Sequence, residues 1–126
     1  MNIENFYQAL DNFFMEKKID KAELFLKDTL SEAEAAEDFG LIIVACNELS
    51  GLYRVLSRYD EGMPLYEKAL ESLRRIGDAE SENYATTLIN YATILNMSGR
   101  HEEALDKYKE VVRILMQQCF SAGSFR

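Results

Sequence analysis

The chain has 126 residues, of which 48% are hydrophobic and 29% charged, and its formal net charge is −8. This length fits one domain with a hydrophobic core, and the acidic balance argues against binding to nucleic-acid phosphates or to an anionic membrane surface. The single proline and six glycines leave no room for long flexible linkers and favour helix.

The N-terminal stretch MNIENFYQALDNFF lacks the basic segment and apolar run of a signal peptide. No uncharged stretch is long enough to cross a membrane. Cys46 and Cys119 lie far apart and form neither a CxxC pair nor a disulfide framework. Together these features predict a reduced, cytoplasmic protein.

Apolar residues recur at helical spacing through six segments, and no segment alternates with the period of two that a strand requires. In chain order, the stripes run through Phe6–Phe14, Ala22–Leu30, Leu41–Leu56, Met63–Leu73, Tyr84–Leu95 and Ala104–Leu115. The breaks between them fall near residues 17–20, 38–40, 57–60, 77–78 and 98–100. The pattern predicts six helices and no sheet.

Residues at the breaks have the chemistry of helix ends. Gly77 and Gly99 favour the left-handed conformation that terminates a helix. Asp20 followed by Glu23 resembles a capping box at the start of the second helix. Pro64 is expected in the first turn of the fourth helix, where its missing N–H costs little.

The chain also repeats itself. Segment 57–70 matches segment 99–112 at an offset of 42 residues, and segment 17–30 matches 57–70 more weakly at an offset of 40. Such a period indicates an array of helix pairs. One position per unit is small, and we expect it to face the partner helix where the two backbones approach closely. The residues at this position are Ala22, Gly62 and Ala104.

These positions resemble the signature of the tetratricopeptide repeat family. The third unit carries it best, with Leu88, Tyr91, Ala92, Leu95, Gly99, Ala104, Tyr108 and Val111. The second unit offers Cys46, Leu49, Ser50, Tyr53, Tyr59, Gly62, Tyr66 and Ala69. The first unit departs from it, because Leu10 stands where the family prefers a small residue. The resemblance covers about residues 3–119, and the period exceeds the usual one of about 34, similar to the extended repeats of kinesin light chains.

The resemblance implies an all-α fold, a right-handed α-solenoid of three antiparallel helix pairs. Its units would span about residues 3–38, 40–76 and 80–119 within a single domain, residues 1–120, followed by a flexible tail at 121–126. It also implies a non-enzymatic scaffold that binds a protein or peptide of unknown identity.

Nothing in the sequence indicates catalysis. No nucleotide-binding, zinc-protease or hydrolase motif occurs. His101 is the only histidine and has no obvious companion ligands, so no metal and no cofactor are expected. Cys46 aligns with a packing position and is expected to be a buried small apolar residue.

In this family the first helices of successive repeats line a concave groove that holds extended peptides or partner helices. The resemblance places in that groove Tyr7, Asp11, Asn47, Glu48, Arg54, Asn90 and Asn96. An alternative is that these are ordinary polar surface residues.

Co-chaperone members of the family clamp an acidic C-terminus with Lys, Asn, Asn, Lys and Arg. Here the matching residues are Tyr7, Asp11, Glu48, Thr86 and Asn90, so a neutral or basic ligand is expected instead.

The last helix suggests a second surface. Its apolar residues spread around too much of the helix to be buried by the fifth helix alone, which predicts a homodimer about a two-fold axis. The residues expected at this interface are Val111, Ile114, Leu115, Met116 and Phe120. Two alternatives to the scaffold therefore stay open: a structural self-associating module, or a peptide-gated sensor fragment of a larger signalling protein.

Overall fold

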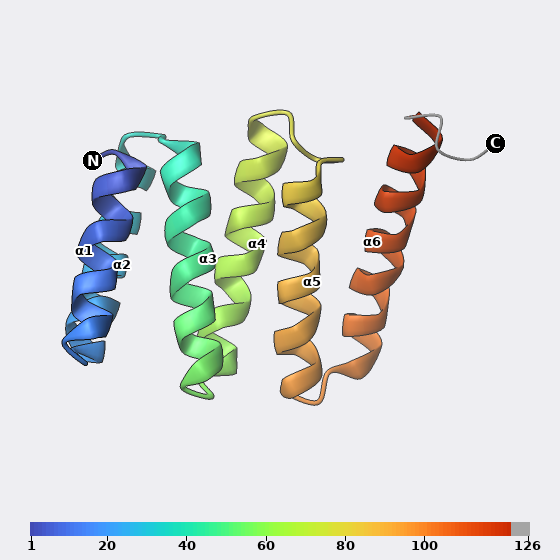
Figure 1. Cartoon of the computed structure of the whole chain (residues 1–126). Coiled ribbons are helices and arrows are strands. Elements are labelled where there is room, and N and C mark those ends of the chain that lie inside the picture. Colours follow the sequence, from blue (N-terminus) through green and yellow to red (C-terminus); the bar gives the residue numbers. More distant parts are fainter. Residues whose placement is uncertain (122–126) are drawn as a thin grey trace.

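A computed structural model describes residues 1–121, which form six α-helices and no strand. The helices are α1 (Ile3–Met15), α2 (Ile19–Ala35), α3 (Phe39–Val55), α4 (Tyr59–Arg75), α5 (Glu82–Met97) and α6 (His101–Ser121). They stand side by side in chain order, with α1 in front of α2 and α6 at the far end of the row (Figure 1). The predicted all-helical solenoid of helix pairs is confirmed. The predicted tail lies, from residue 122 onward, outside the described residues.

The helices are joined by turns of one kind. Four of the five links have three residues, namely 16–18, 36–38, 56–58 and 98–100. In each link the middle residue has a positive φ, and the next N–H bonds back to a carbonyl of the helix that has just ended. At the α3–α4 link, for example, the Arg58 N–H bonds to the Tyr53 carbonyl at 2.8 Å. The left-handed residues of all five links are Lys17, Glu37, Ser57, Gly77 and Gly99.

This geometry satisfies carbonyls at the ends of the helices while reversing the chain. It confirms the helix-ending role expected of Gly77 and Gly99. The link between α4 and α5 is longer and ends at Ser81, whose hydroxyl accepts a bond of 3.1 Å from the Tyr84 N–H.

Two expectations about helix starts are wrong. The N-cap of α2 is Lys18, which makes no side-chain cap, and Asp20 lies within the first turn. Glu23 forms no capping box because its carboxylate bonds Arg58 instead. Pro64 lies in the second turn of α4, since the helix begins at Tyr59. Its ring nitrogen therefore leaves the carbonyl four residues earlier without its helical partner.

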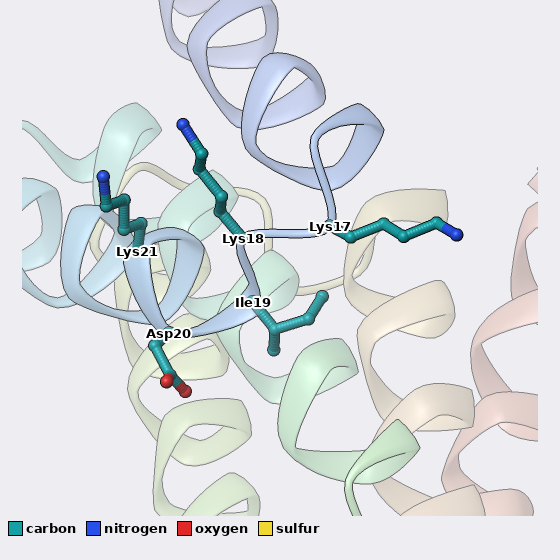
Figure 2. Close-up of a pocket in the computed structure, with 5 residues that line it drawn as sticks. All are labelled: Lys17, Lys18, Ile19, Asp20 and Lys21. Carbon is teal, nitrogen blue, oxygen red and sulfur yellow. The ribbon is translucent and has the colours of Figure 1, made fainter.

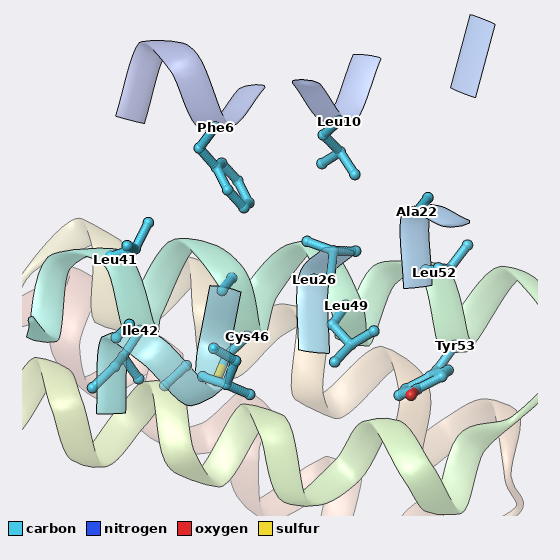
Figure 3. Close-up of a cluster of buried hydrophobic side chains, with 14 residues drawn as sticks. Phe6, Leu10, Ala22, Leu26, Leu41, Ile42, Cys46, Leu49, Leu52 and Tyr53 are labelled. Carbon is cyan, nitrogen blue, oxygen red and sulfur yellow. The ribbon is translucent and has the colours of Figure 1, made fainter. Parts of the chain in front are cut away.

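The core is continuous along the row because α4 contributes to both halves of it. Phe6 and Leu10 point from α1 toward side chains of α2 and α3 in the first half (Figure 3). Ala69 of α4 joins this half. In the second half, Tyr66 of α4 stacks on Tyr91 of α5 with ring centroids 5.8 Å apart.

The repeated small position is buried in all three units, at Ala22, Gly62 and Ala104. Gly62 has the tightest surroundings. A Cβ atom built on it would lie 3.5 Å from Tyr53 Cβ of its partner helix and 2.7 Å from Ile94 Cδ1 of the next repeat. A side chain at this position would require Ile94 of the next repeat to move, which is consistent with a small residue there.

Candidate protein-binding surfaces

An acidic corner forms between the first helices of the first two repeats. Tyr7 and Asp11 of α1 lie near Glu48 of α3. Burial raises the pKa of Glu48 and the charge of Asp11 raises it further, while a hydrogen bond with Tyr7 opposes the shift. Burial and then Glu48 also raise the pKa of Tyr7. Within the described residues, neither Asp11 nor Glu48 forms an ion pair.

Three further predicted groove residues lie on α3 and α5. Asn47, Arg54 and Asn90 are all half-buried. The Asn47 Oδ1 atom is buried and has no hydrogen-bond partner in the part of the chain that the structure describes. Burial raises the pKa of Tyr66, and the charge of Arg54 opposes this shift.

Asn96 lies apart from these residues. Its Oδ1 is 2.6 Å from Nδ1 of His101, at the link between α5 and α6. Both side chains line a hollow of about 280 Å³ beside Ala104, Leu105 and Tyr108. The predicted groove set is therefore divided between the acidic corner, the α3–α5 surface and this end of α6.

A polar cluster that no local sequence pattern predicts lies between the first two repeats. Glu23 of α2 accepts two bonds from Arg58, at 2.7 and 3.0 Å, and one of 2.9 Å from the Tyr53 hydroxyl. Arg58 holds the pKa of Glu23 at about 2. Arg58 also pairs with Glu61, as Arg100 does with Glu103 in the next repeat. That second pattern recurs at the 42-residue offset and was visible in the sequence.

A second hollow, of about 320 Å³, lies at the turn between α1 and α2. Its lining includes Lys17, Lys18 and Lys21 together with Asp20. Lys18 pairs with Glu16, and of the three lysine side chains that of Lys17 points away from the other two (Figure 2). They do not converge on a point where one anionic group would contact all of them.

The prediction for α6 needs correction. Val111 and Ile114 are 6% and 0% exposed, so they belong to the core of the chain and are not free for an interface. They lie on the side of α6 that packs against α5, within the second half of the core. Leu115, Met116 and Phe120 are exposed. Leu105 and Val112, which are not in the predicted interface, are 53% and 56% exposed.

The described residues do not support a metal site or a membrane-spanning helix. They contain no group of three or more His, Cys, Asp or Glu side chains suited to a metal ion. None of their helices is both long and apolar enough to cross a bilayer. Both cysteines are free thiols. Burial raises the pKa of Cys46 to about 12, which keeps this thiol protonated, as expected for a packing residue.

Comparison with known proteins supports the architecture. The family model described as "Tetratricopeptide repeat" matches residues 41–117, more than half of the chain. The crystal structure of the TPR domain of Arabidopsis FLU is similar, with a TM-score of 0.73 over 87% of this chain and 91% of that one. The two sequences are 17% identical, so this likeness concerns the fold alone. A search of curated proteins found no match.

Proposed function

Since this chain belongs to the tetratricopeptide repeat family, whose members generally bind proteins or peptides, we propose that it is a non-enzymatic scaffold that binds a protein segment along α1, α3 and α5. The proposed surface consists of Tyr7, Asp11, Asn47, Glu48, Arg54 and Asn90. Asn96 is a less central member, because it already contacts His101.

The proposal that the ligand has a basic side chain is based on the charge of the acidic corner. Glu48 is half-buried beside Asp11, burial raises the pKa of Glu48, and neither carboxylate has an ion-pair partner among the described residues. A Lys or Arg of a ligand would neutralise both carboxylates and remove that cost. A nucleic acid or an anionic membrane would be repelled at the same place. Asn47 and Asn90 supply amide groups suited to an extended backbone.

The proposal is tested with a library of extended peptides that carry Lys, Arg, Asp or Glu at each position. We expect the protein to select peptides with a basic residue. Asp11→Asn combined with Glu48→Gln should abolish that selection, and Asn47→Ala combined with Asn90→Ala should weaken binding of every selected peptide with little change in melting temperature.

Glu102→Gln is the matched control, because it removes an exposed carboxylate of α6 far along the chain from the acidic corner. It should leave the selection unchanged. Enrichment of acidic peptides, or a selection that survives the Asp11 and Glu48 substitutions, would contradict the proposal.

The cytoplasmic location is part of the same proposal. It is supported by the two free thiols, Cys46 and Cys119, which do not pair with each other.

A further inference from the structure

The exposed face of α6 consists of the same repeat positions as the face of α4 that packs against the next repeat. The offset of 42 residues pairs four residues of α4 with four of α6. On α4 they are packed against α5 and α6 and are 1–5% exposed: Met63, Tyr66, Leu70 and Leu73. On α6 the equivalents are Leu105, Tyr108, Val112 and Leu115, of which Tyr108 is half-buried and the others are 41–56% exposed. The helix α6 therefore exposes apolar repeat positions that are buried on α4.

This face also includes a hollow at the repeat position where, on α4, a side chain of α5 packs. Inside the array, Ile94 of α5 reaches the small residue Gly62 of α4. The equivalent of Gly62 on α6 is Ala104, which lines the hollow of about 280 Å³ together with Leu105, Tyr108 and the hydrogen-bonded pair Asn96 and His101. An aliphatic side chain from another helix would contact the part of this hollow that Ala104, Leu105 and Tyr108 form.

The other end of the chain does not supply such a helix. Tyr91 stacks on α4 and Ile94 approaches Gly62, so these residues define how α5 packs on α4. The repeat offsets, 40 and then 42 residues, place Ala9 and Asn12 at the same positions of α1. Asn12 is exposed and polar. Head-to-tail packing of α1 on α6 would therefore lose the two apolar contacts that hold α5 on α4.

The exposed strip is, however, complementary to itself. Leu105, Tyr108, Val112 and Leu115 are separated by steps of three, four and three residues, which is the same sequence of steps in either direction. Two copies of α6 packed antiparallel about a point near residue 110 would set Leu105 against Leu115 of the second copy and Tyr108 against Val112. Leu115 of the second copy would then lie beside the hollow at Ala104.

Charges at the edge of the strip agree with this arrangement. Asp106 and Arg113 lie seven residues apart on the same flank of α6 and both are exposed, and Arg113 also pairs with Glu80 of its own chain at 3.2 Å. In the antiparallel pair, Asp106 would lie next to Arg113 of the second copy, twice around the two-fold axis. Opposite charges at such an edge favour this register over others.

We propose that the face formed by Leu105, Tyr108, Val112 and Leu115 binds the same face of a second copy, with the two α6 helices antiparallel about a two-fold axis. This interface differs from the one expected from the sequence, because Val111 and Ile114 belong to the core of each chain. It is independent of peptide binding at the acidic corner, which lies on α1 and α3.

The first test measures molecular mass by light scattering over a range of micromolar concentrations. The 126-residue chain should be a dimer. Val112→Glu should raise the dissociation constant by roughly a hundredfold, because it would bury uncompensated carboxylates in the interface. Val55→Glu is the matched control, since Val55 is 77% exposed on α3 and outside the face. Its dimer should be as stable as that of the parent chain.

The second test determines the relative direction of the helices. Asp106→Arg and Arg113→Asp should each weaken the homodimer through like charges. An equal mixture of the two variants should form heterodimers in preference to either homodimer, because every facing pair then has opposite charge. A monomeric parent chain, a dimer insensitive to Val112→Glu, or a mixture without heterodimer would each overturn the proposal. Circular dichroism should show the parent helix content for every variant.

Discussion

At the scale of single residues, Glu23 links the first two repeats by hydrogen bonds in addition to their apolar packing. Its carboxylate lies on α2, whereas its partners Tyr53 and Arg58 lie at the end of α3 and the start of α4. The side chain of Glu23 is 14% exposed and that of Arg58 is 36% exposed. This pair is therefore shielded enough to contribute more than an exposed ion pair of the same geometry.

Glu23→Gln should lower the free energy of unfolding by about 1–2 kcal/mol at neutral pH, because it removes the charge from several hydrogen bonds. The folded-state pKa of Glu23 is about 2, against an ordinary value of 4.5. A lowered pKa means that the stabilisation is complete above about pH 4.5 and is lost as the pH falls toward 2. The stability difference between the parent and Glu23→Gln should follow this course in urea titrations.

Glu61→Gln is the matched control for this measurement. Glu61 pairs with the same Arg58, but its side chain is 51% exposed and Arg58 belongs to the same repeat. Its substitution should change stability much less than Glu23→Gln. Equal effects of the two substitutions, or a Glu23→Gln effect that persists unchanged to pH 2, would show that Glu23 does not stabilise the contact between repeats.

At the scale of helices and turns, one link geometry is used with different residues. Lys17, Glu37 and Ser57 adopt φ values of 52–60° at the position where Gly77 and Gly99 stand in the other links. A residue with a Cβ atom is strained in this conformation, whereas glycine is not. The turn is nonetheless formed with the same backbone bonds in each case.

Ser57→Gly should therefore raise the free energy of unfolding by roughly 0.5–1 kcal/mol, because relief of strain exceeds the added flexibility of the unfolded chain. The reverse substitution, Gly77→Ser, should lower it by about 1 kcal/mol. Thermal and denaturant unfolding of both variants measure the effect. A loss of stability in Ser57→Gly would mean that the serine contributes a contact that outweighs the strain.

The helices and their links could be predicted from the sequence because they depend on local patterns. Apolar spacing located all six helices, and Gly77 and Gly99 marked two helix ends correctly. The local pattern at Asp20 and Glu23 was misleading. The Glu23 carboxylate bonds Arg58, a residue 35 positions away, and therefore does not form the capping box. No local pattern contains a partner at that distance.

The binding surfaces were less predictable for a related reason. The sequence indicates that α6 is apolar on more than one side, but not which side faces α5. Val111 and Ile114 were therefore assigned to an interface although they are core residues. Their equivalents 42 residues earlier on α4, Ala69 and Ser72, are buried, and this comparison contained information about the sides of α6. The acidic corner required no such comparison, because the family resemblance alone assigns Asp11 and Glu48 to the predicted groove.

At the scale of the whole molecule, burial is uneven along the row of helices. Helix α1 buries only Phe6 and Leu10, whereas α3 and α5 each bury eight residues. The reason is topological, since α1 has no preceding repeat to pack against within the described chain. Helices in such an array are stabilised by their nearest neighbours. The free energy that holds α1 in place should therefore be smaller than that of the whole fold.

Native-state hydrogen exchange should reveal this difference. The slowest amides of α1 should exchange through local opening, at a free energy a few kcal/mol below that of the slowest amides of α3, α4 and α5. Leu10→Ala should accelerate exchange in α1 and leave the central helices nearly unchanged, because their mutual contacts remain. Leu70→Ala should accelerate exchange throughout, since Leu70 is 2% exposed and lies in the half of the core shared by α4, α5 and α6. Identical exchange free energies in α1 and α5, or a global response to Leu10→Ala, would mean that the array opens only as one unit.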